Sequence, residues 1–282
     1  MTASQDNAAP SPEDHGLAVG WLDVKFQMAE PEYLAVACAA GFQRGWHVLD
    51  AGCGSGSFLP ALADQVGSTG RLTALDLAPE NVATVRERVE QWGFPVPLET
   101  RTGSVTALPF DDHTFDALWC ANVTLYLSDA ELEKGIAEFR RVVKPGGLVA
   151  IKEVDLGVTR LNPAPCGFFW HFLEATQDIS VQIHGALRSQ HLKRWLERAG
   201  FGAVRQHTTL IERWAPLLPV EHRYISNILA WSAKYALQTA LASDEIAIWE
   251  KLSARDSVDA LVNHPDFYFC EGIILAAGYV PS

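Results

Sequence analysis

Short apolar runs alternate with amphipathic segments through the first half of the chain. The runs are rich in Val, Leu, Ile and Ala, which is typical of strands buried on both faces, and the segments between them show the spacing of helices packed on a sheet. Such alternation is typical of a doubly wound α/β fold with a mostly parallel sheet. The pattern predicts strands at 47–51, 71–76, 97–102, 115–121 and 147–154, and helices at 57–66, 79–92 and 129–143.

Further elements are expected on both sides of this alternating unit. Helical patterns precede it, and a mixture of helices and strands follows it. The additional elements are helices at 17–27 and 31–41, a helix at 190–199, a strand at 203–213, a helical stretch at 219–256 and a last strand at 267–278.

We expect residues 17–282 to form a single domain. Within it, residues 156–188 would lie on the substrate side. Residues 216–263 would form an inserted pair of helices that covers the site or contacts another subunit. Residues 1–16 are predicted to be disordered, because they contain two prolines and few bulky apolar side chains.

The segment 48–56 carries the clearest chemical signal in the chain. An apolar strand ends at Asp50 and is followed by three glycines in five positions, just before a predicted helix. Glycines let backbone N–H groups approach a ligand, and a helix N-terminus adds partial positive charge. A dinucleotide fingerprint would place glycine at position 57, which is Ser57, and Asp50 would repel a diphosphate. This corner therefore favours a cationic ligand carrying an ammonium or sulfonium group.

A second acidic residue, Asp76, ends the next predicted strand. An acid at this place accepts hydrogen bonds from ribose hydroxyls in nucleotide-binding folds. Asp76 could instead cap the following helix, but Pro79 and Glu80 already supply a helix start there. We therefore favour the ribose-binding role.

Four motifs in order resemble those of class I S-adenosylmethionine-dependent methyltransferases, of the branch that includes ubiquinone and menaquinone biosynthesis enzymes. The segment 50–56 resembles motif I, and Asp76 stands where the ribose-binding acid stands. Residues 103–118 resemble the third-strand loop and fourth strand, and residues 140–147 resemble the turn before strand five. The resemblance covers residues 30–155 best. It implies a Rossmann-like, seven-stranded methyltransferase fold with added helices at the N-terminus and between the last two strands.

The resemblance also implies S-adenosyl-L-methionine as the cofactor. Asp50 would act near the methionine amino group, and Asn122 would hold the methionine end through its backbone. Ser104 would lie near the adenine amine, although Ser104 and Asn122 are equally consistent with ordinary loop polarity. The expected cofactor-binding residues are Asp50, Gly52, Cys53, Gly54, Asp76, Leu77, Asn81, Ser104, Val105 and Asn122.

Methyl transfer is an in-line displacement, for which positioning supplies most of the catalysis. A general base is needed only when the acceptor must lose a proton. The candidate catalytic residues are Glu153, His184 and Tyr126, each of which could instead be structural. The aromatic cluster at 168–172 is expected in the core, and if it lined the pocket it would indicate a bulky apolar or aromatic acceptor.

Composition narrows the range of partners. The formal net charge is −12 and basic residues do not cluster, which disfavours a nucleic-acid partner or an electrostatic membrane anchor. The five cysteines form no C-x-x-C pair, so we expect no metal and no disulfide framework, and a cytoplasmic location. No apolar run reaches the length of a membrane span, and residues 1–16 lack the apolar core of a signal peptide.

The expected function is methyl transfer from S-adenosyl-L-methionine to a small hydrophobic or aromatic metabolite, such as a natural product or a quinone-like molecule. One alternative is a cofactor-binding protein that does not methylate, or a cyclase that keeps the pocket. Another is a nicotinamide-dependent oxidoreductase, which Ser57 and Asp50 disfavour. The sequence is also compatible with a homo-oligomer.

Overall fold

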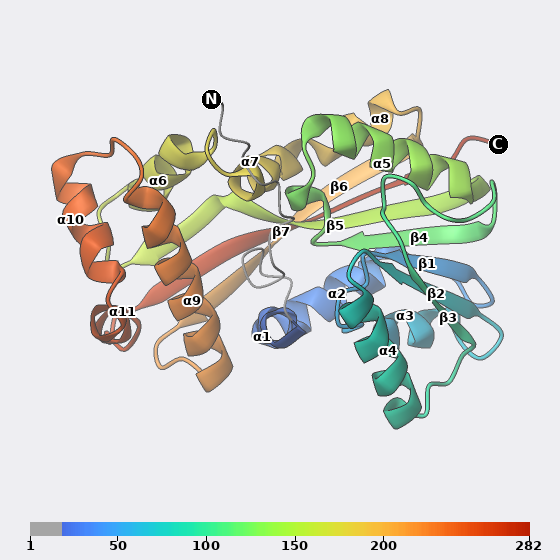
Figure 1. Ribbon diagram of the computed structural model, residues 1–282, viewed down its shortest axis with the longest axis horizontal. Coiled ribbons are helices and arrows are strands. Elements are labelled where there is room, and N and C mark those ends of the chain that lie inside the picture. The colour runs from blue at the N-terminus through green and yellow to red at the C-terminus, as the bar shows by residue number, and fades with distance from the viewer. Residues whose placement is uncertain (1–18) are drawn as a thin grey trace, which may run out of the picture.

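A seven-stranded sheet with the strand order β3-β2-β1-β4-β5-β7-β6 runs through the protein (Figure 1). The structure is a computed structural model that describes residues 19–282, so the predicted tail at 1–16 lies outside the described residues. The first five strands are parallel to one another, and β7 is antiparallel to both β5 and β6. The strands are β1 (His47–Ala51), β2 (Arg71–Asp76), β3 (Leu98–Thr102), β4 (Phe115–Ala121), β5 (Val143–Asn162), β6 (Gly202–Trp214) and β7 (Tyr268–Tyr279).

The predicted fold class is confirmed, including the helices at the N-terminus and between the last two strands. Within the described residues, none of the helices is both long and apolar enough to cross a membrane. The α-helices are α1 (Val19–Met28), α2 (Glu30–Ala40), α3 (Leu59–Val66), α4 (Pro79–Trp92), α5 (Asp129–Val142), α6 (Phe168–Thr176), α7 (Val181–Arg188), α8 (Leu192–Arg198), α9 (Pro219–Ala236), α10 (Ser243–Leu252) and α11 (Arg255–Val262), and the short 3₁₀ helices are η1 (Thr124–Tyr126) and η2 (Ser189–His191).

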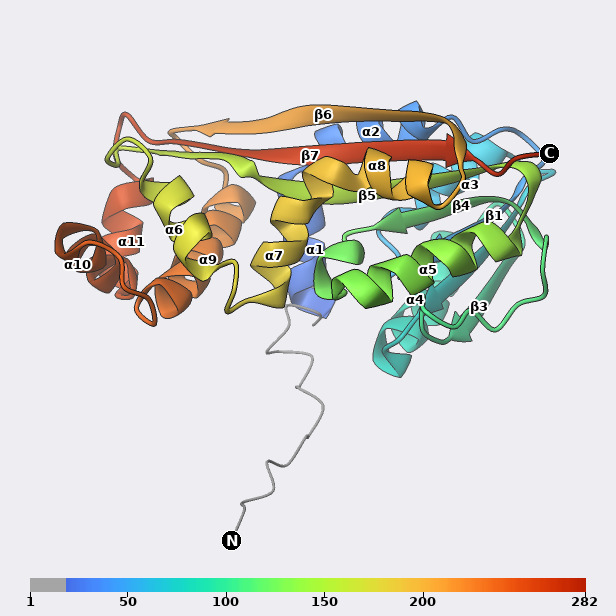
Figure 2. The same cartoon turned by 90° about the horizontal axis from the view of Figure 1, so that it is seen from above.

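Helices cover both faces of the sheet, because successive strand residues point to opposite sides. Leu49 and Leu118 pack with residues of α5 and α8 on one face. Val48 and Ala117 pack with residues of α2 and α3 on the other face. Figures 1 and 2 show these two helical layers with the sheet between them. Because helices cover both faces of the sheet, the site forms at the carboxyl ends of β1 and β4.

The last three strands of the sheet extend well beyond the first four (Figure 2). The strand predicted at 147–154 is too short, because β5 continues to Asn162 and regains pairing with β7 after a register shift between Asp155 and Arg160. Residues 156–162 are therefore strand, whereas α6 and α7 occupy most of the rest of the predicted substrate-side segment. The extension carries α6, α9, α10 and α11 at its far end (Figure 1).

The inserted segment between β6 and β7 contains three helices rather than the predicted pair. The predicted helical stretch breaks near residue 240, and α10 and α11 follow α9. Trp249 of α10 is fully buried, and its ring stacks on that of Phe168 with the centroids 4.5 Å apart. Tyr224 of α9 stacks on Trp21 of α1 at 5.4 Å. The insertion is thus packed onto α1, whose role is described below.

We predict that Gly185→Ala destabilises the fold. A Cβ at Gly185 of α7 would lie 2.3 Å from the Leu125 carbonyl oxygen of η1, which is backbone and cannot rotate away. Overpacking of this kind costs about 1–3 kcal/mol or more. Gly135→Ala is the matched control, because that glycine also lies inside a helix but its added Cβ would meet only ordinary contacts, the nearest at 3.7 Å. Urea denaturation of both variants measures the difference, and equal stabilities would contradict the prediction.

Candidate cofactor-binding site

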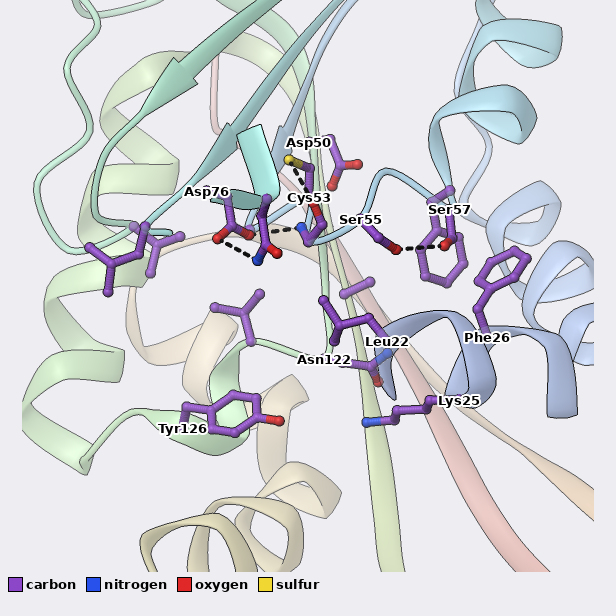
Figure 3. A pocket seen from close by; sticks show the side chains of 18 of the residues that line it. Leu22, Lys25, Phe26, Asp50, Cys53, Ser55, Ser57, Asp76, Asn122 and Tyr126 are labelled. Atoms are coloured by element: carbon purple, nitrogen blue, oxygen red, sulfur yellow. Dashed lines mark hydrogen bonds between the residues drawn. The ribbon is translucent and has the colours of Figure 1, made fainter. Parts of the chain in front are cut away.

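A cavity of about 180 Å³, partly open to solvent, lies at the carboxyl ends of β1, β2 and β4. α1 contributes Leu22, Lys25 and Phe26 to its lining (Figure 3), and α2 contributes Tyr33. All ten residues predicted from the sequence to bind the cofactor line this cavity. Their contact with a bound cofactor stays a prediction.

Asp50 is buried at the end of β1, and only 2% of its surface is exposed. Within the described residues, its Oδ2 atom has no hydrogen-bond partner. Burial, and after it the charge of Asp76, raises the pKa of Asp50 to about 8. A carboxylate in this position is stabilised by any cation that enters the cavity. The site is therefore chemically incomplete without a positively charged ligand.

Asp76 organises the loop around the glycine turn. Its Oδ2 accepts a hydrogen bond of 2.8 Å from the Gly54 amide, and its Oδ1 accepts hydrogen bonds from the Ala78 amide and from Nδ2 of Asn81. Asn81 is buried, whereas Leu77 is 69% exposed at the rim of the cavity. Asp76 thus links the end of β2 to the glycine turn after β1, at the place where a ribose would lie.

Position 52 must be glycine, because Val123 approaches its backbone closely. Its φ is +84°, and a Cβ there would lie 2.3 Å from Cγ2 of Val123. Cys53 follows in a buried position, and burial raises the pKa of its thiol well above the ordinary value. This thiol therefore stays protonated and lines the cavity as a small apolar group.

Ser104 and Asn122 already have hydrogen-bond partners within the protein. The Ser104 hydroxyl lies 2.8 Å from the Thr106 hydroxyl and accepts a hydrogen bond from the Thr106 amide. Oδ1 of Asn122 accepts a 2.6 Å hydrogen bond from Nζ of Lys152. Because their side chains are engaged, both residues offer a ligand mainly their backbone groups.

The three candidate catalytic residues lie in different surroundings. Tyr126 lines the cavity, and burial followed by the charge of Glu153 raises its pKa, so its hydroxyl stays protonated. Glu153 is fully buried and accepts hydrogen bonds from the Thr124 hydroxyl and from the amides of Leu125 and Val154. It anchors η1 and is not among the residues that line the cavity.

His184 is not brought into the cavity. It lies on α7, its side chain is 48% exposed, and its Nε2 lies 3.3 Å from Oδ1 of Asp129. Arg188 of the same helix also pairs with Asp129 and donates to two carbonyls of the η1 segment. In this structure His184 belongs to a surface ion-pair network that joins α7 to the start of α5.

Several cavity residues were not predicted from the sequence. α1 contributes Leu22, Lys25 and Phe26, which lie three and four positions apart and so share one face of the helix. Tyr33 of α2 is also part of the lining. A lysine within an otherwise apolar helical face was the available signal, because lysine is rarely placed on a buried face without a functional or structural partner.

The residues present fit S-adenosyl-L-methionine. The unpartnered Asp50 oxygen suits the methionine ammonium, Gly52 permits the close approach of Val123 that a side chain would block, and Asp76 lies where ribose hydroxyls are bound in this type of sheet. When bound, this cofactor supplies an electrophilic methyl group on sulfur. The fold and this site together define a class I S-adenosylmethionine-dependent methyltransferase.

Comparisons with known proteins agree with this class. Residues 48–147 match the model of a methyltransferase domain family. A ubiquinone/menaquinone biosynthesis C-methyltransferase from Klebsiella pneumoniae subsp. pneumoniae is 30% identical over 180 residues, which span 58% of this chain and 70% of that protein. The chain belongs to the S-adenosylmethionine-dependent methyltransferase family, whose reaction is methyl transfer to a small molecule.

Solved structures show the same fold at low identity. A protein from Bacillus halodurans described as a putative methyltransferase has a TM-score of 0.58 and 18% identity, covering 88% of this chain and 99% of that one. The [4+2]-cyclase SpnF has a TM-score of 0.51 and 19% identity, covering 89% of this chain and 81% of that one.

We predict that binding of S-adenosylhomocysteine at pH 7 releases close to one proton more from the wild type than from Asp50→Asn. With a pKa of about 8, Asp50 is mostly protonated in the free protein, and the ligand ammonium favours its ionised form. The ligand's own titration cancels in the difference. Isothermal titration in two buffers of different ionisation enthalpy measures the released protons, and equal values for both proteins would contradict the assignment.

The same raised pKa predicts how Asp50→Asn changes the stability of the free protein. Between the ordinary value near 3.8 and about 8, the folded state holds a proton that the unfolded state has lost. The free energy of unfolding therefore falls as pH rises through this range, by at most about 1.4 kcal/mol per pH unit. Asp50→Asn removes that fall, so its stability advantage over the wild type should grow from pH 5 to pH 8 in urea denaturation.

We predict that Asp76→Ala weakens S-adenosylhomocysteine binding at least tenfold, because it removes both the ribose acceptor and the bond that holds the Gly54 amide. Asp116→Ala is the matched control. Asp116 also accepts a backbone amide and a side-chain donor, from His47 and Lys144, but at the amino end of β4, away from the cavity. Titration calorimetry should show ordinary affinity for the control, and unchanged affinity in Asp76→Ala would remove the ribose assignment.

Proposed function

We propose that the protein methylates a small hydrophobic or aromatic acceptor that binds in the same cavity as the cofactor. The observation that supports this most directly is the aromatic wall beside the glycine turn. Phe26, Tyr33 and Phe58 line the cavity as one packed group, with the ring of Phe58 5.1 Å from that of Phe26 and 5.7 Å from that of Tyr33. Aromatic walls of this kind bury flat, apolar ligands.

The protein residues would act mainly by positioning. Asp50, Gly52 and Asp76 would hold the cofactor at one end of the cavity. Glu153 fixes η1 through the hydrogen bonds from Thr124 and Leu125, and η1 carries Tyr126 into the cavity. We assign Glu153 a positioning role, because both of its oxygens are engaged by donors within the protein. Holding the reacting atoms in line supplies most of the rate enhancement for a displacement of this kind.

The alternative is a protein that binds the cofactor without transferring its methyl group, or that catalyses a cyclisation. The fold alone does not separate these functions, because a protein described as a cyclase shares it. What favours methyl transfer is an intact set of cofactor groups together with an aromatic wall, both of which line the cavity.

The test is transfer of a deuterated methyl group. The purified protein is incubated with the labelled cofactor and, separately, with a metabolite extract and a panel of small phenols, enols, amines and carboxylic acids. We expect mass spectrometry to find an apolar product carrying the label, together with S-adenosylhomocysteine, and to find neither with Asp76→Ala. Tight cofactor binding without any labelled product across extract and panel would favour the alternative.

A further inference from the structure

Lys25 brings a positive charge to the end of the cavity opposite the two carboxylates. It lies on α1 between Leu22 and Phe26, and all three residues line the cavity. In Figure 3 the Lys25 ammonium points inward, toward the Tyr126 hydroxyl, while Asp50 and Asp76 lie at the other end. The cavity therefore has an acidic end suited to a cationic cofactor and a basic end that this cofactor does not explain.

The ammonium of Lys25 has no ion-pair or hydrogen-bond partner among residues 19–282. The carboxylates that influence it are Glu153 and Glu271. Glu153 is engaged by the donors of η1, and both oxygens of Glu271 accept from the Tyr224 hydroxyl. Loss of solvent lowers the pKa of Lys25, and the two carboxylates only partly oppose that effect. A half-buried ammonium without a partner is stabilised by an anionic ligand group.

A second lysine, Lys152, interacts electrostatically with Lys25. Lys152 of β5 is fully buried, and its Nζ donates to Oδ1 of Asn122 and lies 3.7 Å from the centre of the Tyr33 ring. Burial, and then the charge of Lys25, lowers the pKa of Lys152 well below its ordinary value. The two cationic groups thus repel each other, and an anion bound at Lys25 would relieve that repulsion.

Contacts on both sides hold α1, and with it Lys25, in place. Arg88 of α4 donates to both carboxylate oxygens of Asp23 and to the Ser55 carbonyl of the glycine turn. On the other side, Trp21 stacks on Tyr224 of the inserted helix α9. Because α1 is tied to the cofactor corner itself, Lys25 holds a fixed position relative to the methyl-donor site.

We propose that Lys25 binds the acceptor through an ionisable hydroxyl group, so that the substrate is a phenol or enol held as its anion. This inference rests on the proposed function. The O–H proton passes to solvent, and the Lys25 ammonium pairs with the new oxyanion. The anion's oxygen, or a carbon conjugated to it, then forms a bond to the methyl carbon. The S–CH₃ bond breaks, and its electron pair stays on sulfur.

A weak acid fits this end of the cavity better than a carboxylic acid does. A carboxylic acid is already ionised near neutral pH and would bring its full charge into an aromatic chamber beside Glu271 and Glu153. A phenol or enol enters neutral and ionises only beside the amine. The groups facing Lys25 are otherwise Lys152, whose charge favours the oxyanion, and Asn122 and Tyr126, which are uncharged hydrogen-bonding groups.

The experiment uses 4-nitrophenol as the probe, because its anion and its neutral form have different visible spectra. The full-length protein is saturated with S-adenosylhomocysteine and titrated with the probe one pH unit below the probe's own pKa. We expect the wild type and Lys25→Arg to bind the probe as its anion. In Lys25→Met the bound anion should fall at least tenfold. Lys234→Met, which removes an exposed lysine of α9, is the matched control and should behave as the wild type does.

Three outcomes would overturn the inference: binding of the probe in its neutral form by the wild type, an unchanged anion signal in Lys25→Met, or equally tight Lys25-dependent binding of 4-nitrobenzoate, which would point to a carboxylate acceptor. The affinity for S-adenosylhomocysteine, measured on the same samples, shows that each variant is folded. If the cofactor product binds and the anion forms, but no methyl group is ever transferred, then the proposed function fails while the role of Lys25 stands.

Discussion

Two carboxylates at the ends of neighbouring parallel strands face one cavity, and this concentration of negative charge is the constraint around which the site is built. The register of β1 and β2 places Asp50 beside Ala74, two residues before Asp76. Asp76 is satisfied by the glycine turn and its own loop, whereas Asp50 keeps an unpartnered oxygen. The free protein therefore keeps a destabilised group that a cationic ligand relieves, which is a common way for a binding site to exchange stability for affinity.

The opposite end of the cavity carries positive charge that is also poorly compensated. Lys25 and Lys152 are cations in a poorly solvated region, and the carboxylates around them are engaged by other donors. An acidic end and a basic end on either side of an apolar, aromatic middle would orient two ligands of opposite charge toward each other. For a displacement in which a nucleophile meets a sulfonium methyl group, such an arrangement favours the in-line geometry before any proton moves.

The cofactor half of the site could be predicted from the sequence, because its residues follow strand ends. The strand patterns fix where Asp50 and Asp76 lie, and parallel strands bring their carboxyl ends to one edge. The acceptor half could not, because Lys25 and Tyr33 come from helices whose packing on the sheet leaves no local pattern. Lys152 was passed over in favour of its neighbour Glu153, although a lysine in an apolar strand is itself an unusual feature. The length of β5 was missed because its second half alternates polar and apolar residues after a bulge.

On the proposed function, the parts of the chain outside the matched methyltransferase segment would determine the acceptor side of the cavity. β5, β6 and β7 run on past the parallel strands and place the three-helix insertion where α9 can pack against α1. Glu271 of β7 accepts from Tyr224 of α9, and Tyr224 stacks on Trp21 of α1, so the strand extension, the insertion and the helix that carries Lys25 form one continuous contact. Since Arg88 ties the same helix to the glycine turn, the distance between the two ends of the cavity is set by packing rather than by a flexible loop. A substitution in the inserted helices would therefore alter acceptor binding even though the substituted residue does not contact the acceptor. Cofactor binding at the glycine turn would stay unchanged.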